Sequence, residues 1–172
     1  RLSPDDPRLL TLSTDLAVLK KDTSSAKKTL QRLLVLNGKD GQSLMRLAEL
    51  SIMEKKLPEA GAYLREALPY VQDDPNLRDR TIVLALNSEN SELARRLSEY
   101  ALQKRAGDPG TYLTVAALKE YQKDPAGARQ AALKALDIKA DYQPALNALG
   151  NLSRSTEEQR ELLGRYEQAI AT

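Results

Sequence analysis

The sequence contains no cysteine, histidine, phenylalanine or tryptophan. The absence of cysteine excludes disulfides and thiolate metal ligands, and the absence of histidine removes the commonest general base and the imidazole ligand of zinc. The eight glycines are scattered and form no phosphate-binding loop. We therefore expect no catalytic residues, no metal site and no cofactor, and we predict that the chain is not an enzyme.

The charged residues give no sign of a polyanionic partner. The 26 basic and 24 acidic residues leave a net charge of +2. Basic pairs such as Arg95 and Arg96 have acidic neighbours such as Glu92 and Glu99, whereas a surface that follows phosphates is expected to carry one sign. Apolar runs are only a few residues long, too short to span a membrane. We expect neither nucleic acid as a partner nor direct membrane insertion.

Leucine and alanine supply most of the apolar residues, and they recur with a period of 34 residues. Both favour helices, whereas the β-branched and aromatic residues that strands favour are scarce. A small residue recurs at Ala26, Ala60, Ala94 and Ala128. Three further columns keep this spacing: Leu16, Leu50, Leu84, Leu118, Leu152; Leu33, Ala67, Ala101, Ala135, Ala169; and Leu34, Leu68, Leu102, Leu136, Ile170. These columns predict an all-α chain of repeated helix pairs.

The boundaries of the repeats carry a helix-start signal, because Asp6-Pro7, Asp74-Pro75 and Asp108-Pro109 fall at the same point of the period. Aspartate caps free first-turn amides, and proline suits the first helical position because it has no amide to satisfy. Five repeats follow, over residues 7–40, 41–74, 75–108, 109–142 and 143–172. We expect them to form one solenoid domain across residues 1–172.

The two ends indicate a piece of a longer protein. The chain begins with Arg1 instead of methionine, and the last repeat leaves an apolar face that would want a neighbour or a capping helix. The face is formed by Leu162, Tyr166 and Ile170. We expect either a continuing array or self-association through the C-terminal repeat.

A helix–turn–helix unit of 34 residues resembles the tetratricopeptide repeat (TPR), and the resemblance covers nearly the whole chain. The family's small residue in the first helix corresponds to Thr14, Ala48, Ile82, Ala116 and Gly150. Its bulky aromatic near the start of the repeat is replaced, apart from one tyrosine, by other residues: Leu10, Leu44, Arg78, Tyr112 and Leu146. The resemblance implies a right-handed superhelix whose first helices line a concave groove.

The side of each first helix that faces away from the leucine column is expected to line this groove. The predicted partner-binding residues are Met45, Glu49, Ile52, Asp79, Val83, Leu86, Leu113 and Tyr121. They favour a partner with apolar and basic side chains. In the alternative interpretation, Ile52, Met53 and Leu86 simply pack against the next repeat. The family's carboxylate clamp for an acidic C-terminus is not matched, because acidic residues occupy groove positions.

The predicted function is a non-catalytic scaffold that binds a partner protein, either a peptide or a folded domain, in the concave groove. A second hypothesis is a spacer or assembly module of a bacterial envelope or exopolysaccharide-export machine, where long arrays of this family occur. A third is the recruiting domain of a larger enzyme. The export hypothesis places the chain in the periplasm, and a cytoplasmic location is the alternative.

The leucine column generates a stability prediction. Replacing Leu50 or Leu84 with alanine should lower the free energy of unfolding by about 2–5 kcal/mol, because each change leaves a cavity in the core. Thermal denaturation measures the effect, with Lys55→Ala as the surface control. If the leucine variants are no less stable than the control, the column does not point into the core.

Overall fold

The computed structural model describes residues 3, 5–38 and 40–171, and these residues form ten α-helices and no β-strand. The predicted all-α class is confirmed. The first helices of the pairs are α1 (Pro7–Leu19), α3 (Gly41–Met53), α5 (Pro75–Asn87), α7 (Pro109–Tyr121) and α9 (Gln143–Leu152). The second helices are α2 (Thr23–Asn37), α4 (Leu57–Val71), α6 (Ser91–Arg105), α8 (Pro125–Ile138) and α10 (Thr156–Ala171). Arg1 and Thr172, the limits of the predicted domain, lie outside the described residues.

The helices keep the period of the sequence at their starts. First helices begin at residues 7, 41, 75, 109 and 143, and the second helices of the first four pairs at 23, 57, 91 and 125. The predicted aspartate caps form: Asp6, Asp74 and Asp108 accept hydrogen bonds from first-turn amides, and Asp40 does the same for Ser43. An aspartate cap therefore marks the start of each of the first four repeats, whereas Tyr142, which precedes α9, makes no side-chain cap hydrogen bond.

The turn inside each of the first four pairs has one conformation. Its central residue has a positive φ of 59° or 60°, and these residues are Lys21, Lys55, Glu89 and Lys123. In the second pair the amides of Lys55 and Lys56 donate to the carbonyls of Ile52 and Ser51 at 2.9 and 2.8 Å, which ends the helix with satisfied carbonyls. None of these four residues is glycine or asparagine, so the sequence carries no signal for the left-handed turn.

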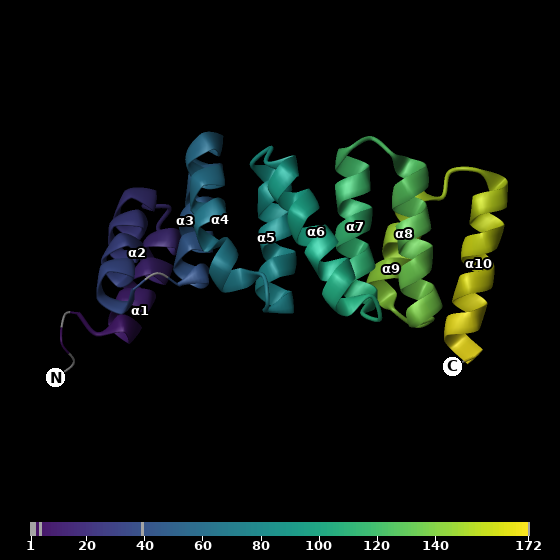
Figure 1. Ribbon diagram of the computed structural model, residues 1–172, viewed down its shortest axis with the longest axis horizontal. Helices are drawn as coiled ribbons and strands as arrows, with labels where there is room; N and C mark the ends of the chain where they lie inside the picture. The colour runs from purple at the N-terminus through teal and green to yellow at the C-terminus, as the bar shows by residue number, and fades with distance from the viewer. Residues whose placement is uncertain (1–2, 4, 39, 172) are drawn as a thin grey trace. The chain divides into compact units, whose positions relative to one another are not determined.

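The chain divides into two compact units, Arg1–Asn90 and Ser91–Thr172. In the first unit α1 packs on α2 and α3 packs on α4, while α2 contacts α3 and α5 contacts both α3 and α4 (Figure 1). Buried residues of α1, α2 and α3 form one core cluster: Leu10, Ala26, Leu30, Leu33, Leu47 and Leu50. The single continuous domain of the sequence analysis stays a prediction.

In the second unit α7 packs on α8 and α9 packs on α10, with α6 against α7 and α8 against α9 (Figure 1). The main core cluster joins α8 to α9 and contains Ala132, Ala135, Leu136, Ala145, Leu146 and Leu149. Among the described residues of α10 none is buried, although Leu162 and Tyr166 pack against this cluster. The predicted apolar face at the end is thus corrected: two of its members point inward, whereas Ile170 is 85% exposed.

Most positions of the predicted columns are buried, whereas Leu34, Leu68 and Leu102 are half-buried. The column from Ala26 to Ala128 has an exposed fraction of 0% throughout, and Leu50, Leu84, Leu118 and Leu152 lie between 3% and 8%. Leu16 departs from the column, because its side chain is 52% exposed. Leu50 packs with Leu30 and Leu33 of the preceding second helix, and no preceding helix lies beside Leu16.

An ion-pair cluster links the first helix pair to the second. The Lys27 ammonium of α2 donates to Glu54 Oε2 at 2.7 Å and to Glu59 Oε2 at 3.3 Å, and Lys56 pairs with Glu54 at 2.9 Å. Lys27 is the main cause of a lowered pKa of Glu54, which falls from 4.5 to about 2, with hydrogen bonds from Thr23 and Lys56 adding to the effect. The cluster therefore favours the folded state only while Glu54 is ionised.

Two glycines predict opposite responses to the same change. An alanine Cβ at Gly41 would lie 2.6 Å from Val71 Cγ1, so Gly41→Ala should destabilise the protein by about 1–3 kcal/mol through overpacking. At Gly61 of α4 the nearest atoms would be 3.5 Å away, so Gly61→Ala should stabilise it by about 0.5–1 kcal/mol. Urea denaturation of both variants measures the two effects. If both variants changed the free energy of unfolding by the same amount and in the same direction, the close packing at Gly41 would be contradicted.

Glu54 predicts a pH-dependent stability. Glu54→Gln should lower the free energy of unfolding near neutral pH, where the wild-type carboxylate is ionised in both states. Because the folded pKa is about 2 and the ordinary value is 4.5, the stabilisation should be lost as the pH falls through this window. Urea denaturation of wild type and variant at several pH values gives the difference. If the difference in the free energy of unfolding between wild type and variant stayed constant down to about pH 2, the ion-pair cluster would not be formed.

Candidate binding surface on the first helices

Within the predicted groove, the exposed side of α1, α3 and α5 in the first unit carries both ion pairs between helices and a pocket. Two ion pairs cross between these helices. Arg46 of α3 donates to Asp15 of α1, and Arg80 of α5 donates to Glu49 of α3, with Nε of Arg80 at 2.9 Å from Oε1. The two acids are 34 residues apart, as are the two arginines, so the pairs repeat along the surface.

These ion pairs change the electrostatics expected for the groove. The sequence predicts acidic residues in the groove, and neither Arg46 nor Arg80 is among the predicted residues. Each acid is neutralised by an arginine 31 residues further along the chain. The shared spacing of the acids and the arginines is the signal that could have revealed the pairs. The surface therefore has little net charge to attract a basic partner.

A small pocket of about 140 Å³ lies on this surface, between α1 and α3. Its lining residues are Thr14, Val18, Leu30, Arg46, Glu49, Leu50, Met53 and Arg80. The Thr14 hydroxyl donates its hydrogen bond to the Leu10 carbonyl of its own helix at 2.9 Å. The lining is apolar except where the two guanidinium groups and the Glu49 carboxylate approach it. Met53 is 60% exposed, which leaves most of its side chain accessible.

Two of the predicted groove residues belong to the core. Met45 is only 1% exposed, and its sulfur lies 3.3 Å from the Thr81 hydroxyl of α5. Leu86 is also buried, and Ile52 is half-buried. The expected exposure of Met45 and Leu86 is therefore corrected, because both side chains are buried.

Asp79 and Val83 lie on α5. Val83 is 48% exposed and remains accessible. Asp79 is half-buried, and its Oδ1 accepts hydrogen bonds from Nε and Nη2 of Arg78, both at 3.3 Å. Arg78 is 1% exposed and occupies the aromatic position of the TPR pattern. Removing Asp79 would take a carboxylate from a buried guanidinium, so Asp79 has a structural role whether or not a partner binds.

The remaining predicted residues, Leu113 and Tyr121, lie on α7 in the second unit. Leu113 is half-buried and packs beside the cluster that joins α8 to α9. Tyr121 is 43% exposed at the last position of α7. Neither of them lines the pocket between α7 and α8.

The described residues hold no group of three or more acidic side chains arranged to bind a metal ion. No helix in the described ranges combines the length and the apolar character needed to cross a bilayer. On the first-helix surface Asp15, Glu49 and Asp79 each form an ion pair with an arginine. What the surface offers a ligand is an apolar recess with guanidinium and carboxylate groups beside it.

Solved structures with the same arrangement of paired helices include MamA residues 41 to end from Desulfovibrio magneticus RS-1, with a TM-score of 0.65 and 12% identity over 99% of this chain and 96% of that one. YrrB, a TPR protein with an unusual peptide-binding site, has a TM-score of 0.61 and 18% identity over 84% of this chain and 74% of YrrB. The chain has the fold of TPR proteins. This fold is generally a module for protein–protein interaction.

A third TPR protein shares the fold, the C-terminal part of a repeat-containing protein from Cytophaga hutchinsonii. Its TM-score is 0.65 at 12% identity, and the match covers 98% of this chain and 68% of that one. No protein-family model matches the sequence, and no curated protein matches it as a relative. The likeness to TPR proteins is therefore one of fold, and the binding residues of this chain have to be inferred from its own surface.

Proposed function

We propose that the chain is a non-catalytic scaffold that binds an extended segment of a partner protein across α1, α3 and α5. The observation that carries this proposal is the pocket between α1 and α3, whose lining combines apolar side chains, the exposed Met53 among them, with polar and charged ones. Pockets that bind peptide side chains are typically apolar with a few polar groups that set orientation. YrrB, which shares the fold, has a peptide-binding site and supports a peptide as the ligand class.

The ion pairs revise the chemistry that we expect of the partner. Asp15 and Glu49 already accept from Arg46 and Arg80, so a basic partner residue would have to displace an arginine. Such an exchange of one ion pair for another yields little free energy at a half-exposed surface. Recognition should therefore come from an apolar side chain that enters the pocket, and the remaining donors of Arg46 and Arg80 can hold backbone carbonyls of the segment.

A spacer is the second candidate function, and the same ion pairs favour it. They join α1 to α3 and α3 to α5, so the charged groups of this surface are paired without a partner protein. Under this hypothesis the array sets a distance between other domains, and the pocket stays empty.

Selection from a random peptide library, followed by affinity measurement, tests the proposal. Met53→Glu should weaken the binding of the selected peptides at least tenfold, which is a loss of about 1.4 kcal/mol in binding free energy, because the substitution places a charge in the pocket lining. The matched control is Val35→Glu on α2, where valine is 84% exposed and remote from the pocket lining. Both substitutions alter exposed apolar residues, so their effects on stability should be similar and small.

Two outcomes would count against the binding surface. If Met53→Glu and Val35→Glu bind the peptides equally, the peptides use another part of the protein. If the library yields no binder at all, the spacer function is favoured. Thr14→Leu would provide a third measurement, since a larger apolar residue should fill part of the pocket from the α1 side without adding charge.

A further inference from the structure

One surface column of the second helices holds a cation in three of the first four pairs. In two of them the cation reaches toward the next helix pair, whereas Arg95 of α6 pairs with Glu92 and Glu99 of its own helix. In the first unit it is Lys27 of α2, whose ammonium bonds Glu54 and Glu59. In the second unit it is Arg129 of α8, three periods later, whose Nη2 lies 2.7 Å from Glu161 of α10. Both side chains are largely enclosed, with exposed fractions of 12% and 11%. In these two repeats a cation of one helix pair thus bonds acidic residues of the next pair.

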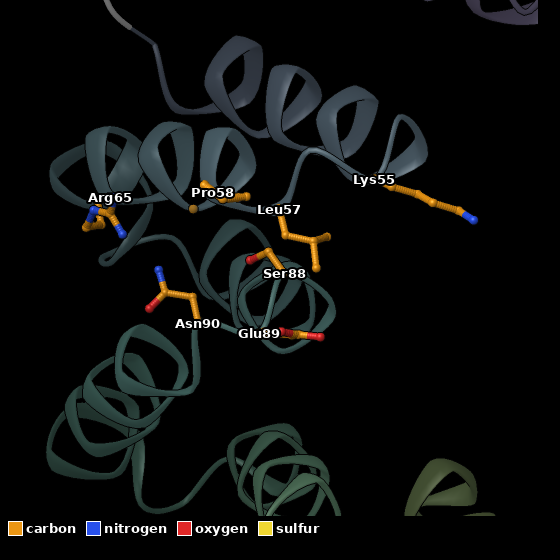
Figure 2. Close-up of a pocket in the computed structure, with 8 residues that line it drawn as sticks. Lys55, Leu57, Pro58, Arg65, Ser88, Glu89 and Asn90 are labelled. Carbon is orange, nitrogen blue, oxygen red and sulfur yellow. The ribbon is translucent and has the colours of Figure 1, made fainter.

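At the second pair the same column holds Gly61, and the space is empty. A hollow of about 570 Å³ lies beside it, lined by α4 and the turn that follows α5 (Figure 2). The lining residues are Lys55, Leu57, Pro58, Gly61, Arg65, Ser88, Glu89 and Asn90. The two acids that Lys27 bonds are also replaced, because the counterparts of Glu54 and Glu59 one period later are Ser88 and Leu93. Both members of the internal ion pair are therefore missing here.

The fold does not require a glycine at this position. Gly61 lies inside α4, and a Cβ there would meet nothing closer than 3.5 Å. Glycine within a helix costs about 0.5–1 kcal/mol relative to alanine. The structural consequence of Gly61 is that the hollow stays open. Local choices that cost stability without a packing reason are expected at functional positions.

Hydrogen-bond donors meet on one side of the hollow. The atoms nearest to a Cβ built on Gly61 are Nη1 of Arg65 and Nδ2 of Asn90, both at 3.5 Å. Figure 2 shows the nitrogens of these two side chains on the same side, while Lys55 extends away from them and the Glu89 carboxylate points elsewhere. Arg65 makes no ion pair with any residue that the structure describes. This side of the hollow therefore presents positive charge to whatever enters it.

We propose that the hollow at Gly61 binds a carboxylate side chain of a partner protein, with the guanidinium of Arg65 and the amide of Asn90 as donors and Leu57 and Pro58 as apolar contacts. The site is separate from the pocket between α1 and α3 and does not depend on it. A guanidinium and an amide are both donors toward a carboxylate, and charge-assisted hydrogen bonds are the stronger kind. A basic side chain would meet Arg65 as a like charge.

Nuclear magnetic resonance with short peptides tests the proposal. The probe is acetyl-Ala-Leu-Glu-Ala-amide, and its control is the same peptide with glutamine in place of glutamate. We expect the glutamate peptide to shift the amide of Gly61, the Nε–H of Arg65 and the side-chain amide of Asn90. The dissociation constant should be on the order of 1 mM, as for one small contact. The glutamine peptide should bind at least tenfold more weakly.

Two variants and a control make the assignment specific. Arg65→Gln removes the charge and should reduce binding at least tenfold, and Gly61→Gln fills the hollow without charge and should do the same. Arg96→Gln, on an exposed arginine of α6, should leave binding unchanged. The chemical shifts of the free variants away from the hollow show that each is folded.

The proposal is overturned by any of three results. The first is an absence of shifts at the hollow with the glutamate peptide. The second is equal binding of the glutamate and glutamine peptides, or of the wild type and Arg65→Gln. The third is tighter binding of an arginine-containing peptide, which would assign the hollow to a basic ligand through Glu89.

Discussion

The close approach of two helices at an alanine is the contact on which each of the first four repeats depends. Ala26, Ala60, Ala94 and Ala128 are completely enclosed. A larger side chain at this position would separate the helices of the pair. The contact also explains why the period tolerates no insertion: one extra residue turns the following helix by about 100° and carries its buried stripe away from the partner.

The constant turn follows from the same contact. If two helices have to meet at a fixed position, the segment between them has to reverse direction in a fixed number of residues. The left-handed residue at Lys21, Lys55, Glu89 and Lys123 achieves this, although lysine and glutamate prefer other conformations. Its cost is spread over four turns and offset by packing in each pair. Local preference thus yields to tertiary packing at the same point of every period.

Outside these positions the repeats are free to differ, and their differences define the candidate sites. The column of Lys27 holds Gly61 one period later, which exchanges an internal ion pair for a hollow. The ion pairs on the first helices end after α5, because the next residues in their columns are Val83 and Thr114. The first unit is therefore held by charges across α1, α3 and α5, and this surface also contains the small apolar pocket.

The fold could be predicted from the sequence because its causes are local and repeated. Alanine columns, leucine columns and Asp-Pro pairs each point to the same helix boundaries. The surface could not be predicted as well, because it depends on which side chains of different helices meet. Met45 was placed in the groove by its helical angle, yet α5 covers it through Thr81. Glu49 lines the pocket between α1 and α3, but its charge is balanced by an arginine on the next first helix.

The last helix pair shows what happens when the central contact changes. Leu162 replaces the alanine of the second helix, and Gly150 stands at the small position of the first helix. A Cβ on Gly150 would lie 3.8 Å from Leu162 Cδ2, so the larger residue of the second helix lies beside a glycine of the first. The helix start changes as well: the Glu158 carboxylate accepts from the amides of Arg154 and Ser155, and Ser155 Oγ accepts from the Glu158 amide at 3.2 Å. This reciprocal cap begins α10 at Thr156, three residues before the period requires, so the left-handed turn of the other pairs has no place here.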